Sequence, residues 1–248
     1  MATGEQFRPR RGVVLSDLHL FARRSKGMAL VNGLDRELLT IDLLVLNGDI
    51  FDFRWSSFPR LEESQTAAAA WLGGLHDDYP RCEIHLVLGN HDGPVSFQDE
   101  LARLAPSLAR FHWHADFLQL GSALFLHGDC AHARMDARRL VRYRQAWEHK
   151  PNRGAWASQA YRGADWLGLT RLVHQWHFPQ RRTVQRIAYY LDDARPGWRR
   201  EVRDCYFGHT HLPMSQFEFE GVRFHNTGSA VGNLGFKPIF FELKAIAG

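Results

Sequence analysis

Residues 12–19 read Gly-Val-Val-Leu-Ser-Asp-Leu-His, a short β-branched run followed by an acidic and an imidazole side chain. An apolar run of this length that ends in polar residues predicts a buried strand over residues 12–16. Side chains two positions apart at a strand end point to the same side, so Asp17 and His19 can converge on one site. The stretch therefore predicts a strand that delivers two metal-ligand types of side chain to one point.

The same arrangement recurs along the chain. Apolar runs alternate with helical patterns at residues 28–39 and 61–75, which predicts an α/β fold with βαβ units and a parallel sheet. In such sheets, ligands bind at the carboxyl ends of the strands. Further strands are expected at residues 42–46, 83–88, 123–126 and 204–207, with an antiparallel region at residues 215–219, 222–225 and 238–243.

Each strand that is expected to carry the site ends in a short polar motif. A single Asp or His at a strand end most often caps a helix or forms a hydrogen bond within the protein. Five such motifs at five strand ends, however, predict that their side chains form one common site. Carboxylates, imidazoles and an amide without thiolates suit Mn²⁺, Fe or Zn²⁺. The motifs are SDLH at residues 16–19, NGDIFD at 47–52, GNHD at 89–92, HGD at 127–129 and GHTH at 208–211.

In this order and spacing, the five motifs resemble those of the calcineurin-like metallophosphoesterases, D-x-H, G-D-x-x-D, G-N-H-D/E, H and G-H-x-H. The resemblance implies a four-layer αββα sandwich and two divalent metal ions, with Mn²⁺ expected and Fe or Zn²⁺ as alternatives. It implies that Asp49 bridges the two ions. The implied ligands are Asp17, His19, Asp49 and His211 for one ion, and Asp49, Asn90, His127 and His209 for the other.

The resemblance also implies roles for residues beside the ligands. His91 matches the histidine of this family that contacts the phosphoryl oxygens or the leaving group, which makes it the expected catalytic acid. Asp52 and Asp92 are expected to support the site without binding metal, with Asp52 orienting a ligand histidine. The implied reaction is in-line attack of a metal-activated water on a phosphate ester or pyrophosphate.

Composition excludes several other classes of protein. The 248 residues are 45% hydrophobic and 23% charged, which fits one elaborated globular domain. No apolar run approaches the roughly 18 residues of a membrane span, and residues 1–11 lack a signal-peptide core, so a cytoplasmic protein is expected. Three cysteines without C-x-x-C spacing, Cys82, Cys130 and Cys205, predict buried thiols.

The charge is concentrated in one segment. Residues 131–203 hold 16 basic and 6 acidic residues and five of the eight tryptophans, whereas the rest of the chain has a charge of −6. We therefore expect a core formed by residues 1–130 and 204–248, and a basic helical insert at residues 131–203 that lies over the cleft as a lid.

The insert and residues 48–53 (GDIFDF) resemble a subgroup of the family, the UDP-2,3-diacylglucosamine pyrophosphohydrolases of lipid A synthesis. This predicts a lipid-linked pyrophosphate substrate and peripheral contact with the inner membrane surface through Arg and Trp side chains. His91, however, stands where that subgroup has arginine. Histidine can also protonate an alkoxide, so a soluble nucleotide or phosphodiester remains the alternative substrate.

Two hypotheses that do not involve catalysis also remain. A protein of this fold can act as a metal-free scaffold, although no ligand position is missing here. The insert can be a solvated helical bundle, with its tryptophans as a small core. Nucleic-acid binding is not expected, because no recognisable motif accompanies the basic and aromatic residues. An exposed helix face of Trp and Leu beside the cleft would favour a lipid, and a continuous track of Arg would favour a nucleic acid.

Overall fold

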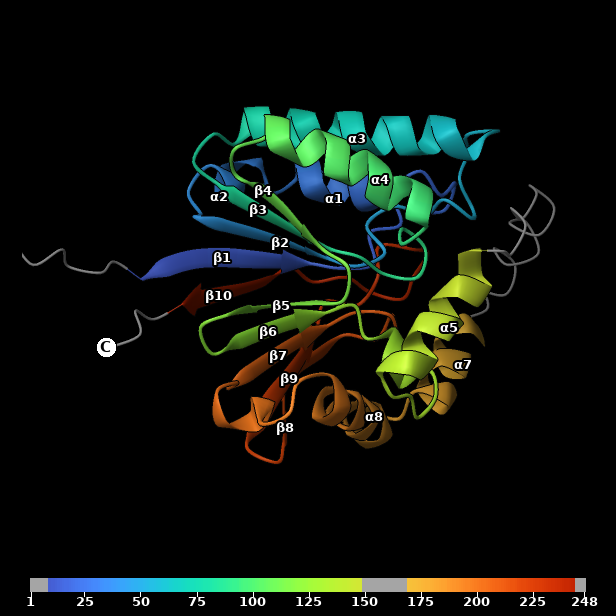
Figure 1. Ribbon diagram of the computed structural model, residues 1–248, viewed down its shortest axis with the longest axis vertical. Helices are drawn as coiled ribbons and strands as arrows, with labels where there is room; N and C mark the ends of the chain where they lie inside the picture. The colour runs from blue at the N-terminus through green and yellow to red at the C-terminus, as the bar shows by residue number, and fades with distance from the viewer. Residues whose placement is uncertain (1–8, 149–168, 244–248) are drawn as a thin grey trace, which may run out of the picture.

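The computed structural model describes residues 9–148 and 169–243 and shows two stacked five-stranded sheets between layers of helices (Figure 1). The first sheet has the order β10-β1-β2-β3-β4, in which β1 to β4 are parallel and β10 is antiparallel to β1. Its strands are β1 (Arg10–Leu15), β2 (Leu43–Asn47), β3 (Glu83–Val87), β4 (Phe111–His114) and β10 (Ile239–Leu243).

The second sheet has the order β5-β6-β7-β9-β8. Strands β6, β7 and β9 are parallel, and the edge strands β5 and β8 are antiparallel to their neighbours. The expected antiparallel region is therefore divided, because β8 and β9 pair with each other while β10 joins the first sheet. The strands are β5 (Phe117–Leu120), β6 (Ala123–Leu126), β7 (Asp204–Phe207), β8 (Met214–Phe219) and β9 (Val222–Asn226).

Four helices cover the outer face of the first sheet: α1 (Gly27–Asn32), α2 (Asp35–Leu38), α3 (Leu61–Asp78) and α4 (Val95–Leu104). The single helix expected over residues 28–39 is wrong, since the chain breaks between α1 and α2. Gly33 lies at the break, where its helix propensity, about 1 kcal/mol worse than that of alanine, favours an end. Helix α4 and strands β4 and β5 were not expected from the sequence.

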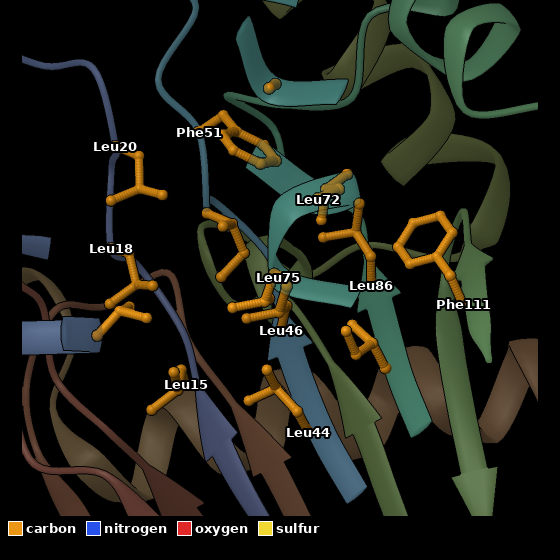
Figure 2. Close-up of a cluster of buried hydrophobic side chains, with 14 of the residues drawn as sticks. Leu15, Leu18, Leu20, Leu44, Leu46, Phe51, Leu72, Leu75, Leu86 and Phe111 are labelled. Carbon is orange, nitrogen blue, oxygen red and sulfur yellow. The ribbon is translucent and has the colours of Figure 1, made fainter. Parts of the chain in front are cut away.

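Apolar side chains of β2 and β3 form the core under these helices. Every residue of β2 is buried, as expected for a central parallel strand covered on both faces. Figure 2 shows Leu44, Leu46 and Leu86 from the strands pointing toward Leu72 and Leu75 of α3. Truncating a fully buried leucine such as Leu72 to alanine is expected to cost about 2–5 kcal/mol. This packing holds the helices against the outer face of the first sheet.

The basic segment contributes to two parts of the structure. Helix α8 (Gln180–Ala194) packs Val184, Ile187 and Leu191 into one core with the outer face of the second sheet, and so forms the fourth layer of the sandwich. Helices α5 (Ala137–Glu148) and α7 (Leu169–His177) instead lie beside the carboxyl ends of the strands (Figure 1). The division of the chain into a core and an insert at residues 131 and 203 stays a prediction.

The three cysteines are buried, as the sequence predicts. Cys82, Cys130 and Cys205 are buried and unbridged. In the ranges that the structure describes, no helix has the length and apolar character needed to cross a membrane.

Candidate metal centre

The carboxyl ends of strands from both sheets meet at one edge of the sandwich and bring the five sequence motifs together. Within residues 9–148 and 169–243, three groups of acidic and imidazole side chains have ligand atoms within 4.8 Å of one another. These groups are Asp17, His19 and His211; His19, Asp52 and His91; and Asp49, His127 and His209.

One group of ligand atoms comes from both sheets. Nε2 of His19, after β1, lies 3.1 Å from Nε2 of His211, after β7. Nε2 of His211 is 3.3 Å from Oδ1 of Asp17, and Nε2 of His19 is 4.0 Å from the same oxygen. Two atoms bound to one tetrahedral ion at about 2.1 Å lie roughly 3.4 Å apart. The spacing of these three atoms therefore fits a single metal ion.

A second group lies next to the first. Oδ1 of Asn90 is 3.1 Å from Nε2 of His127 and 3.0 Å from Nδ1 of His209. These two imidazole nitrogens are 3.3 Å apart. Asn90 is absent from the acidic and imidazole groups above because its ligand atom is an amide oxygen. The three atoms present a second set of donors at the spacing that one ion requires.

Asp49 stands between the two sets. Its Oδ2 atom is 3.3 Å from Nε2 of His127 and 3.9 Å from Nε2 of His19, while its Oδ1 atom accepts the backbone N–H of His91 at 2.8 Å. Burial alone would raise the pKa of Asp49, but the neighbouring His127 and His91 hold this pKa well below its usual value. The carboxylate is thus ionised and faces both sets of nitrogen atoms.

Five residues of the centre have a left-handed backbone, with φ between 48° and 63°. Such a conformation costs a non-glycine residue about 1–2 kcal/mol, and it persists only where the surroundings fix it. Glycines make the close packing between them possible: a Cβ atom at Gly48 would overlap the ring of His127. The five are Asp17, His19, Asp49, His209 and His211.

Two aspartates beside the ligand atoms hold the loops. Asp92 accepts the backbone N–H groups of Gly89 and Ile50, each at 2.7 Å, and so ties the loop after β3 to the loop after β2. Burial and the charge of Asp49 raise the pKa of Asp92 to about 6. Asp52 contacts Nδ1 of His19 at 3.2 Å, which orients that imidazole with Nε2 toward the centre.

His91 lies at the edge of the centre, where a cavity opens. Its Nδ1 atom is 2.9 Å from Oδ1 of Asp52. Burial alone would lower the pKa of His91, but the carboxylates of Asp52 and Asp49 raise it to about 9. The ring also contacts Trp147 of α5, with ring centroids 4.9 Å apart. The two carboxylates therefore favour the protonated form of His91, which can donate a proton.

The cavity beside His91 has a volume of about 440 Å³. Its walls are mainly apolar, and they also carry two arginines, Arg54 and Arg144, and two acids, Asp116 and Glu148. The guanidinium of Arg54 lies 4.7 Å from the ring centroid of Trp147. The apolar lining includes Phe53, Pro59, Leu61, Pro94, Val141 and Trp147.

Three residues of the basic segment that lie outside the five motifs also reach the centre. The ring of His174 stacks on that of His211, and Phe178 meets the ring of His209 edge-on. The centroid of His132 lies 6.1 Å from that of His209. No sequence signal marks His174 or Phe178, because their contacts depend on how α7 packs against the core.

The donor set fits metal ions and contains no thiolate. Nitrogen and oxygen atoms in this mixture suit Mn²⁺, Fe or Zn²⁺. Nδ1 of His127 and Nδ1 of His211 are buried and have no hydrogen-bond partner among the described residues, while the Nε2 atom of each ring faces the other donor atoms. The arrangement supplies two adjacent sets of donors that share one carboxylate, which is the pattern of a two-metal site.

The chain is similar to many solved structures, and two of them show the level of similarity. A predicted phosphoesterase from Streptococcus pneumoniae TIGR4, an uncharacterised protein, is 14% identical, with 94% of this chain and 84% of that chain covered and a TM-score of 0.38. A dimetal phosphatase from Danio rerio is 12% identical, with 91% and 89% covered and a TM-score of 0.45. No curated protein sequence matches significantly.

The sequence pattern of the calcineurin-like phosphoesterase family matches residues 11–213, most of the chain. This range contains all five motifs that supply the two sets of donors. The chain is a metallophosphoesterase, and it belongs to the calcineurin-like phosphoesterase family.

Proposed function

We propose that the protein hydrolyses a phosphate ester or pyrophosphate that carries an apolar group, with two divalent ions, best Mn²⁺, at the centre described above. The single observation that supports this most is the position of His91 between the two sets of donors and an apolar cavity. The ligands would be Asp17, His19, Asp49 and His211 for one ion and Asp49, Asn90, His127 and His209 for the other.

The residues around the centre have complementary tasks in this reaction. When bound, two ions clamp the phosphoryl group and lower the pKa of a water molecule toward about 7, which supplies the nucleophile. His91 donates a proton to the leaving oxygen, and Asp52 keeps that imidazole protonated and fixed through Nδ1. Asp92 holds the loops that carry Asn90 and Asp49 in register.

A variant of the shared ligand tests the metal-dependent reaction. Purified protein with Mn²⁺ should cleave bis-p-nitrophenyl phosphate, and Asp49→Ala should reduce kcat by at least about 10²-fold because it removes a ligand from both ions. Asp99→Ala, an exposed acid on α4, is the matched control and should keep full activity. Full activity in Asp49→Ala would overturn the proposed centre.

The cavity supports an acylated substrate of the UDP-2,3-diacylglucosamine type. Its walls offer apolar surface for an acyl chain, and Arg54 offers positive charge for a phosphate group. Mass spectrometry should show faster cleavage of UDP-2,3-diacylglucosamine than of UDP-N-acetylglucosamine, ADP-ribose or cyclic AMP. Cleavage of the soluble nucleotides alone would assign the alternative substrate class.

The outer face of α7 supports contact with a membrane surface from the cytosolic side. Leu172, Val173 and Trp176 are 61%, 62% and 82% exposed, and Arg171 is exposed next to them. Trp and Leu beside basic residues are typical of helices that lie at the lipid–water interface. An exposed helix face of Trp and Leu side chains favours a lipid surface over a nucleic acid as the partner.

Vesicle binding tests this contact. The protein should sediment with vesicles that contain phosphatidylglycerol, and both Trp176→Ser and high salt should weaken the binding. Gln175→Ser, an exposed substitution on the same helix, is the control. Equal sedimentation of wild type and Trp176→Ser would count against this contact and leave the hydrolase proposal untouched.

A further inference from the structure

His211 lacks the hydrogen bond that orients most metal-binding histidines. Such residues usually donate their second ring N–H to a carboxylate or carbonyl group, as His19 does to Asp52. In the described part of the chain, Nδ1 of His211 is buried and has no hydrogen-bond partner. Something else must therefore fix the plane of this ring.

Helix α7 supplies a contact to that ring. The imidazole of His174 lies face to face with that of His211, with centroids 5.1 Å apart and an angle of 16° between the planes. Nδ1 of His174 donates to the carbonyl oxygen of Thr210 at 3.0 Å. The same side chain thus covers one face of the His211 ring and holds the backbone of the residue before it.

The loop that carries His211 needs such support. His209 and His211 both have a left-handed backbone, with φ of 63° and 59°. From the side of the sheet, Nδ2 of Asn226 donates to the carbonyl oxygen of Gly208 at 2.8 Å. From α7, His174 binds the carbonyl oxygen of Thr210. The strained loop is therefore held between β9 and α7.

Phe178, directly after α7, adds a contact to the other histidine of the motif. Its buried ring meets His209 edge-on, with centroids 5.7 Å apart. The backbone N–H of Phe178 donates to the carbonyl oxygen of His174 at 2.8 Å, which keeps the two side chains at a fixed spacing. One turn at the end of α7 thus touches a histidine from each set of donors.

We propose that His174 is a positioning residue for the metal centre: it holds the His211 ring in the plane in which Nε2 faces the ion. This rests on the proposed ligand role of His211, and it makes α7 a part of the centre rather than only a cover. Loss of His174 should weaken the ion that His211 binds more than the ion that Asn90 binds. Changes to supporting groups of this kind typically lower metal affinity by about 10–100-fold.

Metal titration tests the proposal without relying on activity. Co²⁺ would be added to His174→Ala, to His174→Phe, which keeps an aromatic ring, and to His174→Gln, which keeps an N–H donor. The two dissociation constants would be read from the visible spectrum and checked with a competing chelator. Gln175→Ala on the same helix is the matched control, and thermal unfolding would show that each variant is folded.

In His174→Ala, one dissociation constant should rise by about 10–100-fold while the other stays near the wild-type value, and saturating metal should restore kcat. Recovery of affinity in His174→Phe would assign the effect to ring stacking, and recovery in His174→Gln would assign it to the bond with Thr210. Affinities in a folded His174→Ala equal to those of Gln175→Ala would overturn the proposal.

Failure of the proposed function would look different. If wild type binds two ions and cleaves no phosphoester, the reaction is wrong, while the effect of His174 on metal affinity can still be measured. If Asp49→Ala still binds both ions as wild type does, the proposed ligand set is wrong, whatever His174→Ala shows.

Discussion

Nδ1 of His91 lies 2.9 Å from Oδ1 of Asp52, whose other oxygen contacts Nδ1 of His19 at 3.2 Å. One carboxylate thus serves both the expected proton donor and a proposed metal ligand. Burial alone would raise the pKa of Asp52, but His91 and His19 hold this pKa far below its usual value. Asp52 is therefore ionised at neutral pH.

Asp52→Asn should lower kcat/KM by about 10–100-fold, because it removes the charge that orients both imidazoles. It should also move the alkaline limb of the pH–rate profile to lower pH. An acid must be protonated to act, and the carboxylate of Asp52 raises the pKa of His91. Without that charge, His91 loses its proton at a lower pH. Asp99→Asn should leave both kcat/KM and the limb unchanged, and an unshifted limb in Asp52→Asn would contradict this role.

His91→Gln should discriminate between leaving groups. A general acid typically contributes 10²–10⁴-fold, and the contribution is largest where the leaving oxygen is most basic. The variant should therefore lose roughly that factor in kcat on an alkyl phosphate ester and much less on a p-nitrophenyl ester. Steady-state kinetics on a series of esters of graded leaving-group pKa would show a steeper dependence than in wild type. Equal losses across the series would instead indicate that His91 only binds phosphoryl oxygens.

The sequence was informative where a short segment determines its own geometry. Spacing at the end of β1 predicted that Asp17 and His19 share one side, and in the structure both lie near His211. The same logic placed Asp49 and His127 at strand ends that meet. The end of a strand, the glycine that turns the chain and the side chain that follows are neighbours in the sequence. The direction of that side chain can therefore be predicted from a few residues.

Contacts that depend on tertiary packing could not be predicted in this way. His174 and Phe178 belong to a helical segment whose sequence gives no register against the GHTH loop. Likewise, β4 carries His112 and His114, and a sequence this polar does not resemble that of a strand in a buried sheet. Helix α8 was expected to belong to a lid. An amphipathic helix can cover either a cleft or a sheet, and in the structure α8 packs on the second sheet.

Arg144 and Asp129 form a buried ion pair that fixes α5 to the core. Nε and Nη2 of the arginine donate to the two carboxylate oxygens at 2.7 and 3.1 Å, and Asp129 is 1% exposed. Arg144→Met leaves that carboxylate without its partner and should cost about 3–5 kcal/mol of unfolding free energy.

Urea unfolding would measure this loss. Arg142→Met, on the exposed face of the same helix, is the control and should stay within about 0.5 kcal/mol of wild type. Asp129→Leu combined with Arg144→Met should be less destabilised than the sum of the two single variants, because neither charge is then left alone. A loss in Arg144→Met no larger than in Arg142→Met would show that the pair adds nothing to stability.

A second cluster of imidazoles, on β3 and β4, should make folding sensitive to acid. Nδ1 of His85 lies 3.2 Å from Nε2 of His114, and Nε2 of His85 lies 3.0 Å from Oε1 of Glu83. The ring of His112 stacks on that of His85, with centroids 5.1 Å apart. Burial, followed by the nearby imidazoles, outweighs Glu83 and lowers the pKa of His85 to about 4.

The sign of the pH dependence follows from this lowered pKa. Above about pH 6.5, His85 is neutral in both the folded and the unfolded chain, and its contribution to the free energy of unfolding is fully present. As the pH falls from about 6.5 to about 4, only the unfolded chain takes up the proton, so the free energy of unfolding drops by up to roughly 3 kcal/mol. His85→Gln cannot titrate and should flatten this decline in urea unfolding, whereas His76→Gln on α3 should retain it. An equally steep decline in His85→Gln would assign the acid sensitivity to groups other than this buried imidazole.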